Sequence, residues 1–150
     1  MSKYEITTTS KLHNGVTLYQ IRRLSDGVLG GYIESASNLS QEGTCWVTVN
    51  AVVLGNAQVF ENAQISDYAQ VYGNARVYGN ARVYGNAKVY DNAIILDNTQ
   101  VYQNSLIYEN AIVYDTAKVL GTARVLGKSH VFGTARVAGS TQVSGTQRVQ

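Results

Sequence analysis

A six-residue repeat runs through most of the chain and constrains its fold more than any other feature. From Val47 to Val149 every sixth residue is valine or isoleucine, eighteen consecutive positions without an exception. We number each of these residues as position 1 of a hexad. Position 5 is then nearly always alanine, serine or threonine, and positions 3 and 4 are mostly glycine or an acid followed by asparagine, threonine or serine. A pattern of this regularity predicts a stack of equivalent structural units.

Positions 5, 6, 1 and 2 of each hexad alternate between small or branched apolar residues and polar or aromatic ones. This period of two predicts a short strand, because a helix would need apolar residues at spacings of three and four. The strand at residues 81–84 would point Ala81 and Val83 inward and the other two side chains outward. Gly85 and Asn86 then form a corner, in which we expect asparagine to tolerate the left-handed backbone conformation.

Three such strands and three corners close a triangular coil of eighteen residues, and residues 47–150 hold about six coils. The sequence therefore predicts an all-β fold, a triangular parallel β-helix, with residues 1–46 as a small N-terminal β cap. Because the inward positions carry valine or isoleucine and a small residue, the interior is expected to be dry and close-packed. Any function must then lie on the outer surface.

The hexads themselves resemble a known repeat. Val-Tyr-Gly-Asn-Ala-Arg at residues 71–76 and 77–82 is similar to the hexapeptide repeat of left-handed parallel β-helix proteins, best known from trimeric acyltransferases. The resemblance implies a left-handed coil. The general preference for right-handed parallel crossovers predicts the opposite hand.

The N-terminal segment contains its own strand and turn signals. Residues 16–24 alternate well enough for a strand, Asp26 and Gly27 indicate a turn, and Gly30 and Gly31 predict a tight bend. We expect this cap to cover the first coil and to protect its open strand edge.

Two stretches of this cap carry a narrower resemblance. Residues 27–34 and 38–46 resemble the N-terminal cap of an uncharacterised group of bacterial and phage proteins, one enterobacterial member of which carries an acyltransferase label. Within this stretch Cys45 falls in the small inward position and Trp46 in the outward one. We expect a packed thiol and a ring under the cap, not a reactive cysteine.

Composition excludes several classes of protein. With 45% hydrophobic residues the chain is not disordered, and its single cysteine excludes an intrachain disulfide framework and a Cys-rich zinc site. The first residues lack an apolar run of signal-peptide length, and no segment approaches the roughly 18 apolar residues of a membrane span. We therefore expect a cytoplasmic protein without membrane contact. No metal site is expected either, because the acids that recur at position 3 are typical turn formers. They are Glu61, Asp67, Asp91, Asp97, Glu109 and Asp115.

The acyltransferase resemblance implies a histidine as general base and loops that interrupt the hexads to shape a cofactor cleft. The chain has two histidines, His13 and His130. His13 belongs to a turn of the cap, and His130 occupies outward position 6 without an acid in its own hexad. His130 is therefore only a weak catalytic candidate. Because no loop interrupts the register, we expect no cofactor.

Outward position 2 is aromatic far more often than a solvent-facing strand requires. Residues eighteen apart stack on one face, which predicts aromatic ladders along the solenoid. One ladder is accompanied by isoleucines, and the resulting exposed apolar patch indicates an interface. The first ladder consists of Tyr72, Tyr90 and Tyr108, the second of Phe60, Tyr78, Leu96, Tyr114 and Phe132, and the patch of Ile94, Leu96, Ile112 and Tyr114.

Basic and aromatic residues also alternate near the middle of the chain. Arg76, Arg82 and Lys88 each precede an aromatic residue by two positions, as Arg82 precedes Tyr84, a spacing that could bind a nucleic-acid backbone and stack bases. The three basic residues fall on three different faces of one coil, however. They would encircle the solenoid without forming a groove, so we do not expect nucleic-acid binding.

The sequence leaves three hypotheses for function. The first is a non-catalytic, self-associating binding protein that presents flat aromatic faces to a protein partner, in its most concrete form a phage-encoded inhibitor of a host enzyme or defence complex. The second is a hexapeptide-type acyltransferase that uses acetyl-CoA, and the third is a structural or assembly protein. Closed symmetry allows a homotrimer about an axis parallel to the solenoid or a twofold dimer. The contact would lie at the apolar patch or, in a dimer, at the uncovered C-terminal strands. We favour the patch, so changing Ile94 and Ile112 together to lysine should yield a folded monomer.

Overall fold

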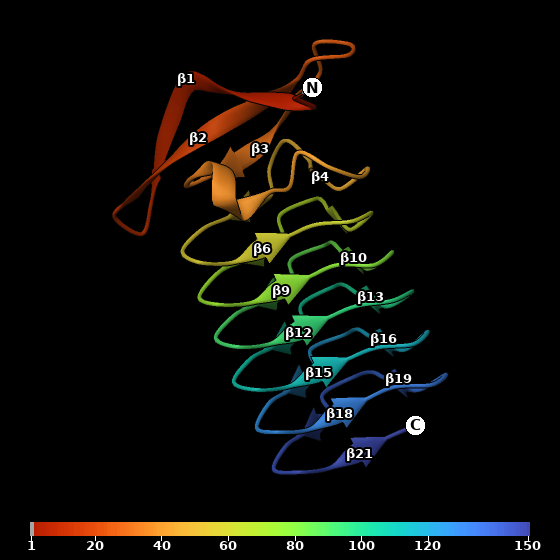
Figure 1. The fold of residues 1–150 in the computed structure, drawn as a ribbon. Helices are drawn as coiled ribbons and strands as arrows, with labels where there is room; N and C mark the ends of the chain where they lie inside the picture. Colours follow the sequence, from red (N-terminus) through yellow and green to blue (C-terminus); the bar gives the residue numbers. More distant parts are fainter. Residues whose placement is uncertain (1) are drawn as a thin grey trace.

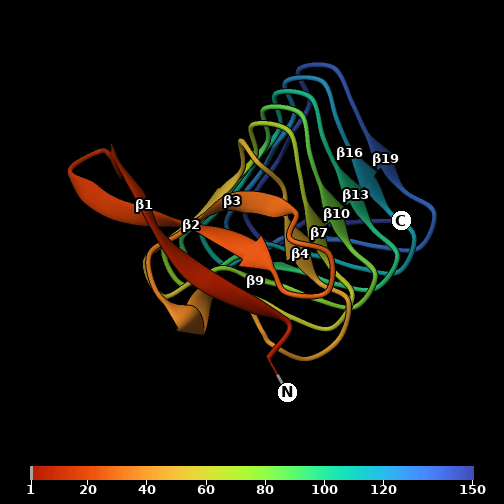
Figure 2. The same ribbon diagram turned by 90° about the horizontal axis from the view of Figure 1, so that it is seen from above.

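The computed structural model describes residues 2–150 as a triangular β-solenoid beneath a small antiparallel cap (Figure 1). Paired residues in neighbouring coils lie eighteen apart, as Arg82 and Gln100 do, so each coil contains three hexads. Three parallel sheets form the three walls of the solenoid, and the view along its axis shows the triangular section (Figure 2). The predicted all-β fold, coil length and cap are confirmed.

Each strand of the coils is two residues long, and we refer to the three sheets as walls A, B and C. Wall A contains β5 (Val52–Val53), β8 (Gln70–Val71), β11 (Lys88–Val89), β14 (Leu106–Ile107), β17 (Arg124–Val125) and β20 (Gln142–Val143). Wall B contains β6 (Gln58–Val59), β9 (Arg76–Val77), β12 (Ile94–Ile95), β15 (Ile112–Val113), β18 (His130–Val131) and β21 (Arg148–Val149). Wall C contains β4 (Trp46–Val47), β7 (Gln64–Ile65), β10 (Arg82–Val83), β13 (Gln100–Val101), β16 (Lys118–Val119) and β19 (Arg136–Val137).

The coil is left-handed, as the hexapeptide resemblance implies. In Figure 1 the strands of wall B face the viewer and run from left to right while the coils descend toward the C-terminus. A right-handed coil would run from right to left in this view. The hand is thus the opposite of that favoured for ordinary parallel crossovers.

In the corners, the asparagine at position 4 does not adopt the left-handed backbone conformation that the sequence predicted for it. Position 3 does so, whether it is glycine, as at Gly85 with φ 67°, or an acid, as at Asp97 with φ 62°. The asparagine at position 4 has another role: Asn86 donates its backbone N–H to the carbonyl of Gln103 one coil further on, at 2.8 Å. Asparagine side chains also bond from coil to coil, as Asn80 Nδ2 does to Asn98 Oδ1 at 3.2 Å. Position 4 therefore joins the coils.

The cap is an antiparallel unit of β1 (Tyr4–His13), β2 (Val16–Arg23) and β3 (Leu29–Ile33), followed by the short 3₁₀ helix η1 (Ala36–Asn38). The strand predicted at residues 16–24 corresponds to β2, whereas β1 was not predicted from the sequence. Strand β3 pairs in parallel with β5, so the cap extends wall A into a sheet of nine strands. This pairing protects the first coil on that wall.

Gly30 and Gly31 form no bend, because both lie inside β3. Their small size instead allows close packing: a Cβ on Gly31 would collide with the carbonyl oxygens of Thr48 and Ala51. The expected packing of Cys45 and Trp46 is confirmed, since both are buried.

Tyr4, the first residue of β1, connects the cap to the loop before the first coil. Its hydroxyl donates to the carbonyl of Leu39 at 2.6 Å, and burial raises the pKa of Tyr4 to about 12. The phenol ring lies edge-on to Trp46, with the ring centroids 6.4 Å apart. These contacts join the first strand of the chain to the first coil.

Candidate binding surface

The interior of the solenoid is filled by the inward positions 1 and 5. Val89 and Ala87 are typical, with no exposed surface. The three buried hydroxyl residues at position 5 each donate to a carbonyl three residues earlier, at 2.7 to 2.9 Å, so their polar groups are satisfied locally. They are Thr99, Ser105 and Ser129. A close-packed interior of this kind leaves the outer walls as the place for recognition.

The aromatic ladders form as predicted. On wall A the rings of Tyr72, Tyr90 and Tyr108 are stacked almost parallel, with centroids 4.9 and 5.0 Å apart. Wall C carries a further pair, Tyr84 and Tyr102, at 4.9 Å. Such stacking between neighbouring strands contributes to stability, and it also makes each wall flat.

Wall B carries the second ladder. Phe60 stacks on Tyr78 at 4.6 Å and Tyr114 on Phe132 at 5.2 Å. Leu96 takes the ladder position between these two pairs, one coil above Tyr114.

The structure brings Ile94, Leu96, Ile112 and Tyr114 together on wall B, and we call these residues the apolar quartet. Ile94 and Ile112 are register partners in β12 and β15. Each side chain of the quartet is half-buried, because its neighbours along the wall cover part of its surface. The quartet is thus a flat apolar strip less exposed than the sequence suggested.

The basic residues Arg76, Arg82 and Lys88 lie on walls B, C and A respectively, as expected. Arg76 lies against two rings of wall B: its guanidinium carbon is 5.3 Å from the ring centroid of Phe60 and 5.6 Å from that of Tyr78. Because the three charges point in three directions, they form no common groove for a nucleic-acid strand.

His130, the catalytic candidate, lies on wall B beside the quartet. Its ring meets Tyr114 edge-on, with centroids 5.9 Å apart, and its Nδ1 is buried without a hydrogen-bond partner. No ion pair in the described residues 2–150 involves His130. A histidine without an orienting carboxylate lacks the usual support for a general base. His13, the other histidine, ends β1 in the cap.

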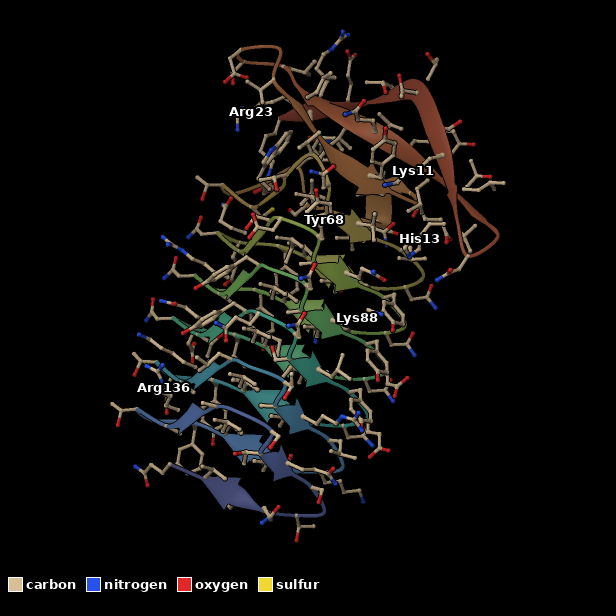
Figure 3. All side chains as sticks on the ribbon, turned by 180° about the vertical axis from the view of Figure 1, so that it is seen from behind. Lys11, His13, Arg23, Tyr68, Lys88 and Arg136 are labelled. Carbon is tan, nitrogen blue, oxygen red and sulfur yellow. The ribbon has the colours of Figure 1, made fainter. Side chains whose placement is uncertain are left out.

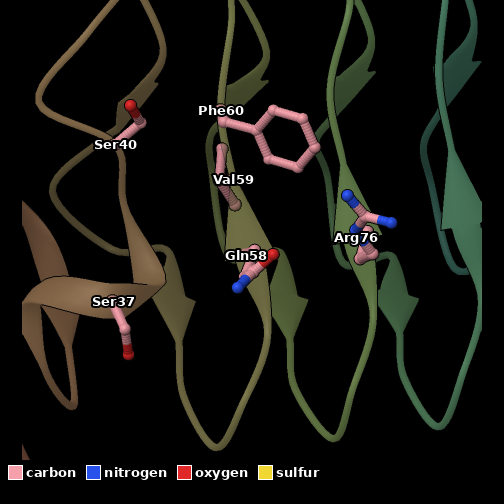
Figure 4. A pocket seen from close by; sticks show the side chains of 6 residues that line it. All are labelled: Ser37, Ser40, Gln58, Val59, Phe60 and Arg76. Atoms are coloured by element: carbon pink, nitrogen blue, oxygen red, sulfur yellow. The ribbon is translucent and has the colours of Figure 1, made fainter.

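A shallow pocket of about 270 Å³ opens where η1 and the loop after it meet the upper end of wall B (Figure 4). Its lining combines the Phe60 ring and the Arg76 side chain with the hydroxyls of Ser37 and Ser40. None of these residues supplies a general base. In residues 2–150 no group of three His, Cys, Asp or Glu is placed to hold a metal ion. None of the helices in this part of the chain is long and apolar enough to cross a membrane.

The most exposed apolar side chains of the described residues were not predicted from the sequence. Leu12 is 73% exposed near the end of β1 in the cap hairpin. Tyr68 is 62% exposed at a corner between walls C and A (Figure 3). The signal for Tyr68 was available, since it replaces the usual Asn, Thr or Ser of position 4. Leu12 belongs to β1, whose outward residues could not be assigned before the strand was recognised.

Carboxylates at position 3 perform a specific task in the corners. In each corner the carboxylate accepts the backbone N–H of the position 3 residue one coil further on: Asp115 Oδ2 accepts from Gly133 at 2.9 Å, and Glu109 Oε2 from Gly127 at 2.7 Å. An amide does the same, because Gln103 Oε1 accepts from Gly121 at 2.7 Å. The predicted role as turn formers is confirmed.

Asp115→Ala should therefore lower the free energy of unfolding by about 1–2 kcal/mol, because it removes this hydrogen bond and leaves alanine at φ 61°. Asp115→Gly should cost less than about 1 kcal/mol, since glycine adopts this conformation without strain. Thermal denaturation of the two variants separates these effects. Equal losses in both would show that the backbone conformation of the corner contributes nothing.

Comparison with known proteins adds one match, and it falls within the repeat. No curated protein matches the chain. Residues 69–85, which cover β8, β9 and β10, match the family model described as the YdcK beta solenoid repeat. Over this part of the solenoid the chain is similar to the YdcK beta-solenoid repeat family.

Proposed function

We propose that the chain is a non-catalytic β-solenoid that acts by protein–protein contact through its outer walls. The apolar quartet on wall B is the observation that carries the proposal, because an apolar strip of isoleucine, leucine and tyrosine on an outer wall is typical of an interface. The filled interior and the uninterrupted hexads support it, since they leave no cleft of the kind that a hexapeptide acyltransferase builds from inserted loops. In its concrete form, the protein inhibits a host enzyme or defence complex and is encoded by a phage, as the resemblance of the cap implies.

Copurification tests this proposal. A tagged chain isolated from its source cells should retain one protein in stoichiometric amount, and the recombinant pair should re-form the complex. The quartet variant Ile94→Ser/Ile112→Ser should lose that protein, whereas Tyr90→Ser on wall A should keep it. Retention of the same protein by both variants would move the contact away from wall B, and the absence of any stoichiometric protein would contradict the proposed function.

An acyltransferase is the second candidate, favoured by one observation: the buried Nδ1 of His130 on wall B has no hydrogen-bond partner. Acetyl-CoA should nevertheless leave the melting temperature unchanged. A ligand with micromolar affinity at millimolar concentration would stabilise the native state by roughly 4 kcal/mol, which thermal denaturation would detect. His130→Ala should likewise leave the biological activity intact. A clear rise in melting temperature with acetyl-CoA, abolished by His130→Ala, would establish the acyltransferase instead.

A further inference from the structure

This inference rests on the proposed function and names the surface and the chemistry of the partner. We propose that the apolar quartet docks an amphipathic helix of another protein, one whose apolar stripe has lysine or arginine on both sides. Three arguments support this assignment: the charges around the quartet, the like-charge contacts that a symmetric dimer through wall B would make, and the dimensions of the wall.

Four carboxylates surround the quartet, and we call them the frame. Asp91 and Glu109 stand at the corners before β12 and β15, and Asp97 and Asp115 stand at the corners after them. Residues 91–115 contain these four acids and no basic residue. Among residues 2–150 the only ion pairs are Arg22–Glu5 and Arg23–Asp26, both in the cap, so the four charges are not neutralised within the described chain.

Corner chemistry does not explain these charges. At the same level of the solenoid, the third corner carries the neutral Gln103, whose backbone and hydrogen bond match those of Glu109: φ is 59° and 58°, and both side chains accept a glycine N–H at 2.7 Å. An amide therefore satisfies the corner as well as a carboxylate does. Next to the quartet the charges occupy both edges of wall B and spare the opposite edge, which indicates a basic partner.

The same frame disfavours a second copy of this chain. A twofold axis in the plane of wall B, centred on the quartet, can run along the solenoid or across it. In the first case the edge with Asp91 meets the partner's edge with Asp97, and in the second each edge meets its own copy. Both arrangements place carboxylates against carboxylates, and like charges across an interface oppose association. A partner with the opposite charges avoids this conflict.

The dimensions of wall B fit a helix lying along the solenoid axis. About five residues separate the two corners, which at ~3.3 Å per residue gives a strip roughly 16 Å wide, enough for a helix of about 10–12 Å diameter. Successive coils repeat at ~4.8 Å, close to the ~5.4 Å pitch of an α-helix, so successive turns of the helix would meet successive coils. Recognition of an amphipathic helix by an apolar strip is a common mode of peptide binding.

The probe is an 18-residue synthetic peptide with blocked ends, leucine at helical spacing (i, i+3, i+4, i+7) and lysine elsewhere; a second peptide has glutamate in place of lysine. Fluorescence anisotropy should show binding of the lysine peptide to the wild-type chain and none of the glutamate peptide. The frame variant, Asp91→Asn/Asp97→Asn/Glu109→Gln/Asp115→Asn, keeps an acceptor at every corner. Its affinity should fall at least about tenfold, because four exposed ion pairs are lost, and its melting temperature should stay within about 3 °C of wild type.

Two controls separate docking from general attraction to acids. The remote variant Asp67→Asn, which removes a corner carboxylate on the edge between walls C and A, opposite wall B, should bind as wild type does. Ile94→Ser/Ile112→Ser should also weaken binding at least about tenfold through the loss of apolar contact.

Three results would overturn the inference: lysine-peptide binding unchanged in the frame variant, binding unchanged in the isoleucine variant, or no binding to wild type. A chain that self-associates more tightly when the frame is neutralised would assign the quartet to a second copy. If the copurified protein binds while the lysine peptide does not, the proposed function stands and this assignment of partner chemistry fails.

Discussion

Val89→Asp is expected to unfold the middle coils of the solenoid. Val89 has no exposed surface and stacks in register between Val71 and Ile107. An aspartate there has no base or hydrogen-bond donor to pair with, and burying it should cost about 4 kcal/mol or more. Hydrogen exchange followed by mass spectrometry should show lost protection in the strands around β11, and circular dichroism should show a large fall in melting temperature.

Tyr90→Ser is the matched control, because the altered residue is adjacent in sequence but points outward. It removes the two stacked contacts of Tyr90 with Tyr72 and Tyr108 while leaving the interior intact. The loss should be about 1–2 kcal/mol, the size of two cross-strand aromatic contacts. If both substitutions prove equally mild, the assignment of inward and outward positions is wrong.

Gly31→Ala is the second change with a large expected effect, and it acts on the cap. The added methyl group would overlap the carbonyl oxygens of Thr48 and Ala51, which belong to the solenoid backbone and cannot rotate away. Strand β3 must then move off β5, which should cost about 3 kcal/mol in local stability. Hydrogen exchange should show unprotected amides in β1, β2 and β3 while the coils below β5 stay protected.

Gly15→Asn provides the control for Gly31→Ala. Gly15 lies in the β1–β2 turn, where a Cβ would meet no atom within 4 Å and φ is 82°. Asparagine tolerates the left-handed backbone conformation, so the loss should be below about 1 kcal/mol. Wild-type exchange throughout the cap of Gly31→Ala would show that β3 does not need a glycine.

The coils could be predicted from the sequence because the residue pattern of each hexad indicates its strand and its corner. The unbroken Val/Ile column determines the strand, the inward face and the coil length at once, and stacking copies of one unit leaves few alternatives. The ladders and the quartet could be predicted in the same way, because residues eighteen apart in the sequence stack on one wall. For this reason the outward residues predicted on each wall are the ones that the structure brings together.

The features that escaped prediction depend on contacts that no local pattern records. Strand β1 has mixed polarity and is defined by its pairing with β2. Two adjacent glycines such as Gly30 and Gly31 usually indicate a bend; that they lie in a strand packed closely against the backbone of residues 47–51 is seen only in the folded structure. The roles of positions 3 and 4 in the corner could not be distinguished, because both glycine and asparagine tolerate a positive φ. Handedness came from resemblance alone, since the general rule for parallel crossovers gives the wrong hand.

The charged frame of the quartet also became visible only in three dimensions. Along the chain Asp91, Asp97, Glu109 and Asp115 form a band of acids, which suggests a solvated surface. The structure places two of them on each edge of wall B and a neutral glutamine on the opposite corner. The band of acids therefore lies along the two edges of wall B. This placement is what suggests a basic partner for that wall.

Site-specific photo-cross-linking of the copurified complex tests most directly whether the outer walls carry the function. A photoreactive phenylalanine analogue would replace Tyr114 on wall B, Tyr90 on wall A and Tyr102 on wall C, one at a time. The account predicts a cross-link to the partner from position 114 and none from the other two. A partner that is retained without a cross-link from any wall, and that is lost instead when Leu12 of the cap is changed to lysine, would contradict it.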